Sequence, residues 1–143
     1  MSDALYNAAI LRLKLAGEVA HRLASPDASA TRVSPVCGSK IIADVALAGD
    51  GRIAAVGMDA SKACTLGQAS AAVALERVPG MDAATLSVTR TALADFLANR
   101  AEAAPDGWAM FAPARAHRAR HPSILLALDA LLAALAEPGQ AAA

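Results

Sequence analysis

The sequence is poor in aromatic residues, with one tryptophan, one tyrosine and two phenylalanines among 143 residues. It has no net charge, because thirteen basic residues balance thirteen acidic ones. We therefore expect neither nucleic acid nor a membrane surface as a partner. No apolar run of about 18 residues occurs without a charge, which excludes a membrane span. The N-terminal residues contain no continuous signal-peptide core, so we expect a cytoplasmic protein.

Cysteine is scarce as well, since Cys37 and Cys64 are the two in the sequence. In a reducing compartment such a pair is expected as free thiols or ligands rather than as a disulfide. The abundant residue is alanine, at 40 of the 143 positions, which implies a core built from small side chains. This length corresponds to one domain. We predict a single domain over residues 1–143, with its core at about 5–135 and a tail at 136–143.

The spacing of apolar residues predicts both helices and strands. The expected helices run from a cap at Ser2 or Asp3 to about Leu23, over 66–77, over 82–99 with a break near Ser87, and from Pro122 to about 135. The expected strands are an edge strand within 28–34 and a hairpin of 40–47 and 52–58, with Ile41, Ala43, Val45 and Leu47 on one face. Residues 108–120 have no clean period and are expected to cross the surface. This order indicates an α+β fold, a small antiparallel sheet of about three strands with helices packed on one face.

Three side chains are candidates for chemistry. Cys37 lies between a proline and a glycine on a turn before a strand, a position that suits a ligand. Cys64 lies at or beside a helix N-terminus, where the macrodipole favours a thiolate. His121 precedes Pro122 at the expected N-cap of the last helix and offers an imidazole nitrogen. The cysteine spacing matches no zinc finger, and on these residues alone both thiols also fit as buried core residues.

Four short segments, spread over the chain in a fixed order, resemble those of the NifU N-terminal, IscU and SufU family of iron–sulfur cluster assembly scaffolds. They are Leu5-Tyr6-Asn7, Pro35-Val36-Cys37-Gly38, Cys64-Thr65-Leu66-Gly67 and His121-Pro122-Ser123-Ile124-Leu125. The resemblance implies a fold of the SufE and NifU type. In that family three cysteines and an aspartate hold a [2Fe–2S] cluster, or a zinc ion in its place.

The resemblance places Cys37 and Cys64 at the first two cysteines and His121 at the family's histidine. Two ligand positions differ, since Ser39 stands where the family has its aspartate and Pro122 where it has its third cysteine. In addition, Ala63 replaces a glycine and His117 is a more distant candidate ligand. The implied site is therefore Cys37, Cys64 and His121, which suits iron, zinc or a labile [2Fe–2S] cluster.

The function that follows from the resemblance is that of a scaffold-like protein rather than an enzyme. Its expected partners are a cysteine desulfurase and other iron–sulfur assembly proteins. Two alternatives stay open. In the first, the protein is an adaptor of the same fold that has lost the cluster and docks on a desulfurase through its arginine-rich segment 115–120. In the second, Cys64 accepts persulfide sulfur from the desulfurase.

Overall fold

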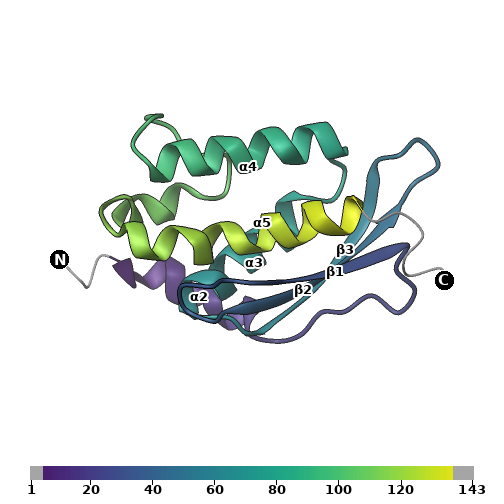
Figure 1. Cartoon of the computed structure of the whole chain (residues 1–143), viewed down its shortest axis with the longest axis horizontal. Coiled ribbons are helices and arrows are strands. Elements are labelled where there is room, and N and C mark those ends of the chain that lie inside the picture. Colours follow the sequence, from purple (N-terminus) through teal and green to yellow (C-terminus); the bar gives the residue numbers. More distant parts are fainter. Residues whose placement is uncertain (1–4, 137–143) are drawn as a thin grey trace.

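The structure is a computed structural model that describes residues 5–136 (Figure 1). Along the chain lie α2 (Ala8–Gly17), β1 (Ala28–Val33), β2 (Lys40–Leu47), β3 (Ile53–Lys62), α3 (Thr65–Arg77), α4 (Ala83–Leu97), the 3-10 helices η1 (Ala109–Ala116) and η2 (Arg118–Arg120), and α5 (His121–Leu135). The three strands form an antiparallel sheet in the order β1-β2-β3. Helices α3 and α5 pack on one face of this sheet, and α4 covers α5 on the side away from it (Figure 1). The predicted α+β class is confirmed.

Side chains of β2 point alternately to the two faces of the sheet, and those on one face contact the helices. Ile41, Ala43 and Val45 are buried as predicted. Leu47, expected on the same face, is 42% exposed because it lies at the turn end of the hairpin, just after a register shift between Ala46 and Leu47. The second hairpin strand is longer than predicted, since β3 continues past Met58 to Lys62. The added residues pair with the first residues of β2 and so bring the end of β3 beside the loop that precedes β2.

The first helix begins later than predicted. Ser2 and Asp3, the expected caps, lie outside the described residues. Helix α2 begins after Asn7, whose side-chain oxygen accepts a hydrogen bond from the backbone N–H of Ile10 at 3.0 Å. Asn7 therefore satisfies one of the N–H groups that the first helical turn leaves without a partner.

The same helix ends earlier than predicted, at Gly17 rather than near Leu23. A Cβ atom at Gly17 would lie 1.8 Å from the carbonyl oxygen of Gln68 on α3. The two helix backbones thus touch where no side chain fits, which requires glycine. Apolar periodicity does not register this contact, because the residues after Gly17 look as helical as those before it.

Residues 18–27 form a linker that crosses the outer face of the sheet below its strands (Figure 1). His21 forms an antiparallel bridge with Met58, and its N–H and C=O both bond to that residue, at 2.7 and 2.9 Å. A Cβ atom at Gly57 would lie 2.6 Å from the carbonyl oxygen of His21. Glycine at this position therefore lets the linker lie directly against β3.

Asp44, the register partner of Gly57 on β2, fixes the linker on this face. Its carboxylate accepts hydrogen bonds from Arg22 Nε at 2.7 Å and Arg22 Nη2 at 2.9 Å. It also accepts from the Leu23 backbone N–H at 3.0 Å and from Ser29 Oγ at 2.6 Å. Asp44 is fully buried. We call Asp44, Arg22, Leu23 and Ser29 the Asp44 cluster.

The later helices follow the sequence prediction closely. Helix α3 ends just before Pro79-Gly80, as expected. Helix α4 is continuous, so the expected break near Ser87 is wrong; Asp82 caps it by accepting from the Thr85 N–H at 2.8 Å. Helix α5 begins at His121, with Arg120 rather than His121 at the N-cap. Among residues 5–136 the structure has no helix that is both long and apolar enough to span a bilayer.

The segment 108–120 is not the surface crossing that the sequence predicted. Trp108, Phe111 and Ala114 are all buried, at the three-residue spacing that a 3-10 helix places on one side. The Trp108 Nε1–H donates to Ser70 Oγ on α3 at 3.0 Å, and the Ser70 hydroxyl donates to the Ile124 carbonyl on α5 at 2.6 Å. These bonds join η1, α3 and the first turn of α5.

Candidate functional site

Cys37 lies in the loop 34–39 that joins β1 to β2. Two backbone hydrogen bonds close this loop, from Ser34 N–H to the Ser39 carbonyl and from Gly38 N–H to the Ser34 carbonyl, each at 2.8 Å. Gly38 has φ +74°, a left-handed conformation that glycine adopts without strain. The thiol of Cys37 is exposed at the tip of this turn.

Cys64 occupies the N-cap position of α3, as the sequence predicted, and is half-buried. Its thiol makes no capping hydrogen bond, so the sulfur is not used to hold the helix. Its backbone N–H donates to Ser39 Oγ at 3.0 Å. A Cβ atom at Gly67 would lie 3.1 Å from the Ala63 Cβ and 3.9 Å from Cys64 Sγ, so glycine keeps this first turn open beside the sulfur.

Two buried serines connect the cysteine segments to the rest of the fold. Ser39 Oγ lies 3.0 Å from Cys37 Sγ, and Ser123 Oγ of α5 also lies 3.0 Å from Cys37 Sγ. Ser39 and Ser123 are 4% and 1% exposed. Ser34, in the same loop, is buried and its hydroxyl forms no hydrogen bond with any residue between 5 and 136. We call Cys37, Ser39, Cys64 and Ser123 the thiol site.

The hydroxyls change the acidity of Cys37. Desolvation raises the pKa of its thiol, but hydrogen bonds from the Ser123 and Ser39 hydroxyls and from the Ser39 backbone N–H favour the thiolate and outweigh it. The net effect lowers the pKa of Cys37 to about 6. At neutral pH the exposed sulfur is therefore mainly a thiolate, the form that binds metals and attacks sulfur. From the sequence we expected the stabilised thiolate at Cys64, on the ground of the helix macrodipole. The contact between Ser123 and Cys37 was not predicted.

His121 lies on the same first turn of α5 as Ser123, but its ring is engaged elsewhere. Its Nε2 lies 2.7 Å from the carbonyl oxygen of Ala114 in η1. His117 is exposed at the end of η1. Pro122 lies between His121 and Ser123 in the first turn of α5. Across residues 5–136, no three His, Cys, Asp or Glu side chains gather closely enough to hold a metal ion. The structure thus joins Cys37 to Cys64 through Ser39, while His121 bonds toward η1.

This donor set limits what the site holds by itself. A [2Fe–2S] cluster bound by protein alone takes four ligands. The thiol site supplies two thiols and two neutral serine hydroxyls, and proline at 122 adds no donor. The remaining ligands of an iron ion or cluster would come from water, His121 or a partner. The arrangement therefore suits cargo that is held briefly.

Comparisons with known proteins identify the family and the fold of the chain. A scan against protein-family models and a search of curated proteins each find no match. Among solved structures, the chain is similar to a nitrogen-fixing NifU-like protein (N-terminal) from Brucella abortus, with 34% identity over 94% of each chain and a TM-score of 0.83. The chain therefore shares the α+β fold of that protein. The chain belongs to the NifU-like N-terminal family.

Two more distant structures support the fold alone. One is described as a putative iron–sulfur cluster assembly scaffold protein for the SUF system from Fervidobacterium islandicum AW-1, with 16% identity, 94% coverage of this chain, 99% of the other and a TM-score of 0.80. The other is a hypothetical protein with 18% identity, 88% and 98% coverage and a TM-score of 0.71. The predicted resemblance to the NifU and SufU group is confirmed.

Proposed function

We propose that this protein acts in iron–sulfur cluster assembly as a scaffold-like protein that binds iron, zinc or a labile [2Fe–2S] cluster through Cys37 and Cys64, with His121 assisting. The observation that carries the proposal is the shared contact at Ser39, whose hydroxyl lies 3.0 Å from Cys37 Sγ and 3.0 Å from the Cys64 backbone nitrogen. Two segments that are distant in sequence thus meet at Ser39, which supports a site shared by the two cysteines.

The chemistry of these side chains supports the proposal. Thiolates are favoured ligands of zinc and of iron in clusters, and zinc also accepts imidazole and water in an open position. Neither thiol is committed to a disulfide. We propose a cysteine desulfurase and other iron–sulfur assembly proteins as partners, in a cytoplasmic location. The protein would present cargo to them rather than catalyse a reaction.

A second candidate function is sulfur acceptance, and the exposure of Cys37 favours it. The Cys37 thiolate would attack the outer sulfur of a persulfide on a desulfurase. A new S–S bond would form on Cys37, and the desulfurase cysteine would leave as a thiolate. The sequence assigned this role to Cys64. Cys37 is the better nucleophile because it is the exposed thiol and lies among hydroxyl donors.

The test is metal and sulfide analysis of protein purified under anaerobic conditions, with an absorbance spectrum, for the parent, Cys37→Ser and Cys64→Ser. We expect both substitutions to lose bound metal, because each removes one of two thiolates. Ser87→Ala, on the exposed face of α4, is the control and should keep it. Unchanged metal in both cysteine variants would rule out the two-thiol site.

Labelled sulfur from a desulfurase separates the two candidates. Sulfur acceptance at Cys37 predicts that Cys37→Ser loses the label while Cys64→Ser keeps it. A protein that takes up neither metal nor sulfur but still binds the desulfurase would instead be the adaptor, docking through residues 115–120.

A further inference from the structure

A hollow of about 540 Å³ lies between the C-terminal end of α4, the 3-10 helices and the first turn of α5. We call it the arginine hollow. Its lining includes Leu97, Asn99, Arg100, Arg115, Arg118 and His121. Pro122 lines it as well and also lines a second groove of about the same volume, so the two cavities meet at this residue. The lining of the arginine hollow contains none of Cys37, Ser39, Cys64 and Ser123, and His121 is the residue that it shares with the proposed metal ligands.

Arg115 forms the fixed part of the lining. Its Nε donates to the Phe96 carbonyl and its Nη2 to the Ala101 carbonyl, both at 2.9 Å. Its guanidinium also lies over the Phe96 ring, 4.6 Å from the centroid. These partners hold the position of the side chain at the end of α4 but carry no negative charge. The positive charge of Arg115 is therefore not neutralised by an acid.

The other two arginines are less restrained. Arg100 has its nearest carboxylate, Asp95, at 3.8 Å, and its side chain is 76% exposed. The side chain of Arg118 forms no hydrogen bond or ion pair with any residue between 5 and 136. Among the described residues, the lining of the arginine hollow contains no acidic side chain. Three arginines thus line one cavity of a protein whose formal net charge is zero.

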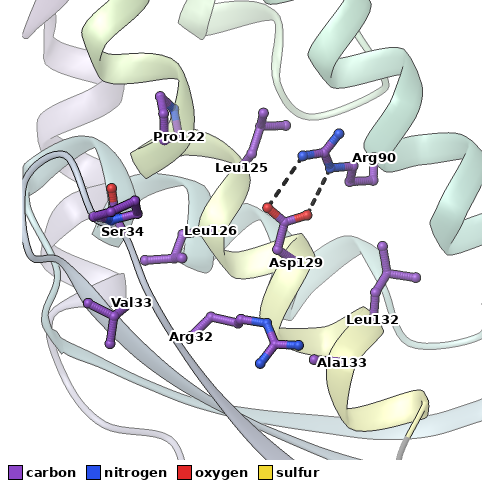
Figure 2. Close-up of a pocket in the computed structure, with 11 residues that line it drawn as sticks. Arg32, Val33, Ser34, Arg90, Pro122, Leu125, Leu126, Asp129, Leu132 and Ala133 are labelled. Atoms are coloured by element: carbon purple, nitrogen blue, oxygen red, sulfur yellow. Dashed lines mark hydrogen bonds and ion pairs between the residues drawn. The ribbon is translucent and has the colours of Figure 1, made fainter.

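The second groove shows a different arrangement (Figure 2). There Arg90 reaches from α4 to Asp129 on α5, with Nε 2.8 Å and Nη2 3.4 Å from the carboxylate oxygens. Figure 2 shows Arg32 of β1 on the opposite wall of this groove. Asp129 therefore neutralises the charge of Arg90 within that groove. The arginine hollow has no equivalent of Asp129.

We propose that the arginine hollow binds a small organic or inorganic anion with at least two negative charges, carried on carboxylate or phosphate groups. A guanidinium group matches either oxyanion with two parallel hydrogen bonds. Bringing an anion between Arg100, Arg115 and Arg118 relieves their mutual repulsion. The volume falls in the range of small-molecule sites, and Leu97, Pro122 and Leu125 add apolar walls for a short carbon skeleton.

The experiment is titration calorimetry with citrate and with inorganic phosphate at constant ionic strength, on the full chain. The test variant is Arg100→Ala with Arg118→Ala. The control is Arg12→Ala with Arg32→Ala, which removes the same charge from exposed positions on α2 and β1. We expect saturable binding of at least one anion by the parent and the control, and binding weaker by roughly tenfold or more in the test variant. A preference for citrate or for phosphate identifies the oxyanion.

A second variant tests the geometry of the guanidinium group. Arg118→Lys keeps the charge but loses the two-pronged donor, so we expect a partial loss of affinity between the parent and the double variant. Ring resonances of His121 should shift on anion addition in the parent. Equal weakening in the test and control pairs would mean a general charge effect and would overturn the proposal. Absence of saturable binding of both anions to the parent would overturn it as well.

Discussion

The Asp44 cluster and the thiol site are both polar groups that join separate segments of the chain, yet their bonding differs. The Asp44 carboxylate is fully buried and receives four hydrogen bonds from its own chain. Cys37 Sγ is exposed and is surrounded by serine hydroxyls. Each serine hydroxyl has one donor and two acceptor sites, so these groups can form hydrogen bonds beyond the ones described.

This difference separates a polar cluster whose acceptors are all bonded within the chain from one that leaves a sulfur exposed. In the Asp44 cluster each carboxylate oxygen already accepts two hydrogen bonds from the chain. Breaking the cluster would therefore lower the free energy of unfolding. In the thiol site the sulfur retains room for a group from outside the chain. The Asp44 cluster and the thiol site thus differ in how fully their polar atoms are hydrogen-bonded, not in how polar they are.

The largest expected effect is on the Asp44 cluster. Asp44→Ala should lower the free energy of unfolding by about 3 kcal/mol, because hydrogen bonds to a charged group contribute roughly 1.5–3 kcal/mol and the Leu23 N–H loses its partner. Urea unfolding measures this as a lower midpoint with an unchanged slope. Asp50→Ala, in the exposed hairpin turn, is the matched control and should change little.

The same cluster predicts a pH dependence of stability. Burial raises the pKa of Asp44, but hydrogen bonds from Arg22, Ser29 and the Leu23 N–H outweigh it and lower the pKa below its usual range. A lowered folded-state pKa gives stability that is present above the unfolded-state pKa and is lost as pH falls through the folded value. The parent should therefore lose more stability on acidification than Asp44→Ala. Parallel pH profiles would mean that the carboxylate is not held as described.

The next effect concerns the capacity of the thiol site. Pro122→Cys with Ser39→Asp restores the two ligands of the family pattern, so an anaerobically reconstituted cluster should resist a chelator longer than in the parent. We expect a gain of roughly tenfold or more in lifetime, since single changes around a metal site alter affinity by 10–100-fold. For Pro122→Cys alone the cost in stability should stay below about 2 kcal/mol, because proline acts at a first helical turn mainly through chain entropy. Equal decay of absorbance in both proteins would show that the pocket itself no longer fits a cluster.

The smallest effect is on the acidity of Cys37, where burial raises the pKa and the hydroxyls lower it to about 6. In a Cys64→Ser background, Ser123→Ala should raise this pKa and slow alkylation at pH 6 by roughly threefold, because loss of one hydrogen bond of about 1 kcal/mol lowers the acidity constant about fivefold and the parent thiol is about half ionised at this pH. Iodoacetamide rates measured across the pH range give both midpoints. Ser87→Ala is the control, and an unchanged midpoint in Ser123→Ala would exclude the hydroxyl as the cause.

The sequence predicts well the elements whose apolar pattern matches their final packing. Alternation placed Ile41, Ala43 and Val45 on the buried face of β2, and the leucine-rich run after Pro122 forms α5. The first helix was extended too far because the close approach at Gly17 depends on α3, a distant part of the chain. Asp44 alternates as a solvent-facing residue and is buried because the linker covers it.

The segment of Trp108 was misjudged for a different reason. Its buried residues repeat every three positions, a spacing typical of 3-10 helices, and periods of two or 3.6 do not detect it. In the thiol site the cysteines were identified through the resemblance and the turn and cap positions. Their serine partners were not, because only the fold brings Ser123 within 3.0 Å of Cys37, which is 86 positions away.

Ser39 gives the thiol site a property that an aspartate at this position would not. The hydroxyl accepts from the Cys64 N–H and from the protonated Cys37 thiol. When Cys37 loses its proton, the same hydroxyl rotates and donates to the sulfur, because it holds one donor and two acceptor sites. An ionised carboxylate can only accept a hydrogen bond, so it would bind the protonated thiol and repel the thiolate. Ser39 can therefore accommodate both ionisation states of Cys37 without a change in the backbone.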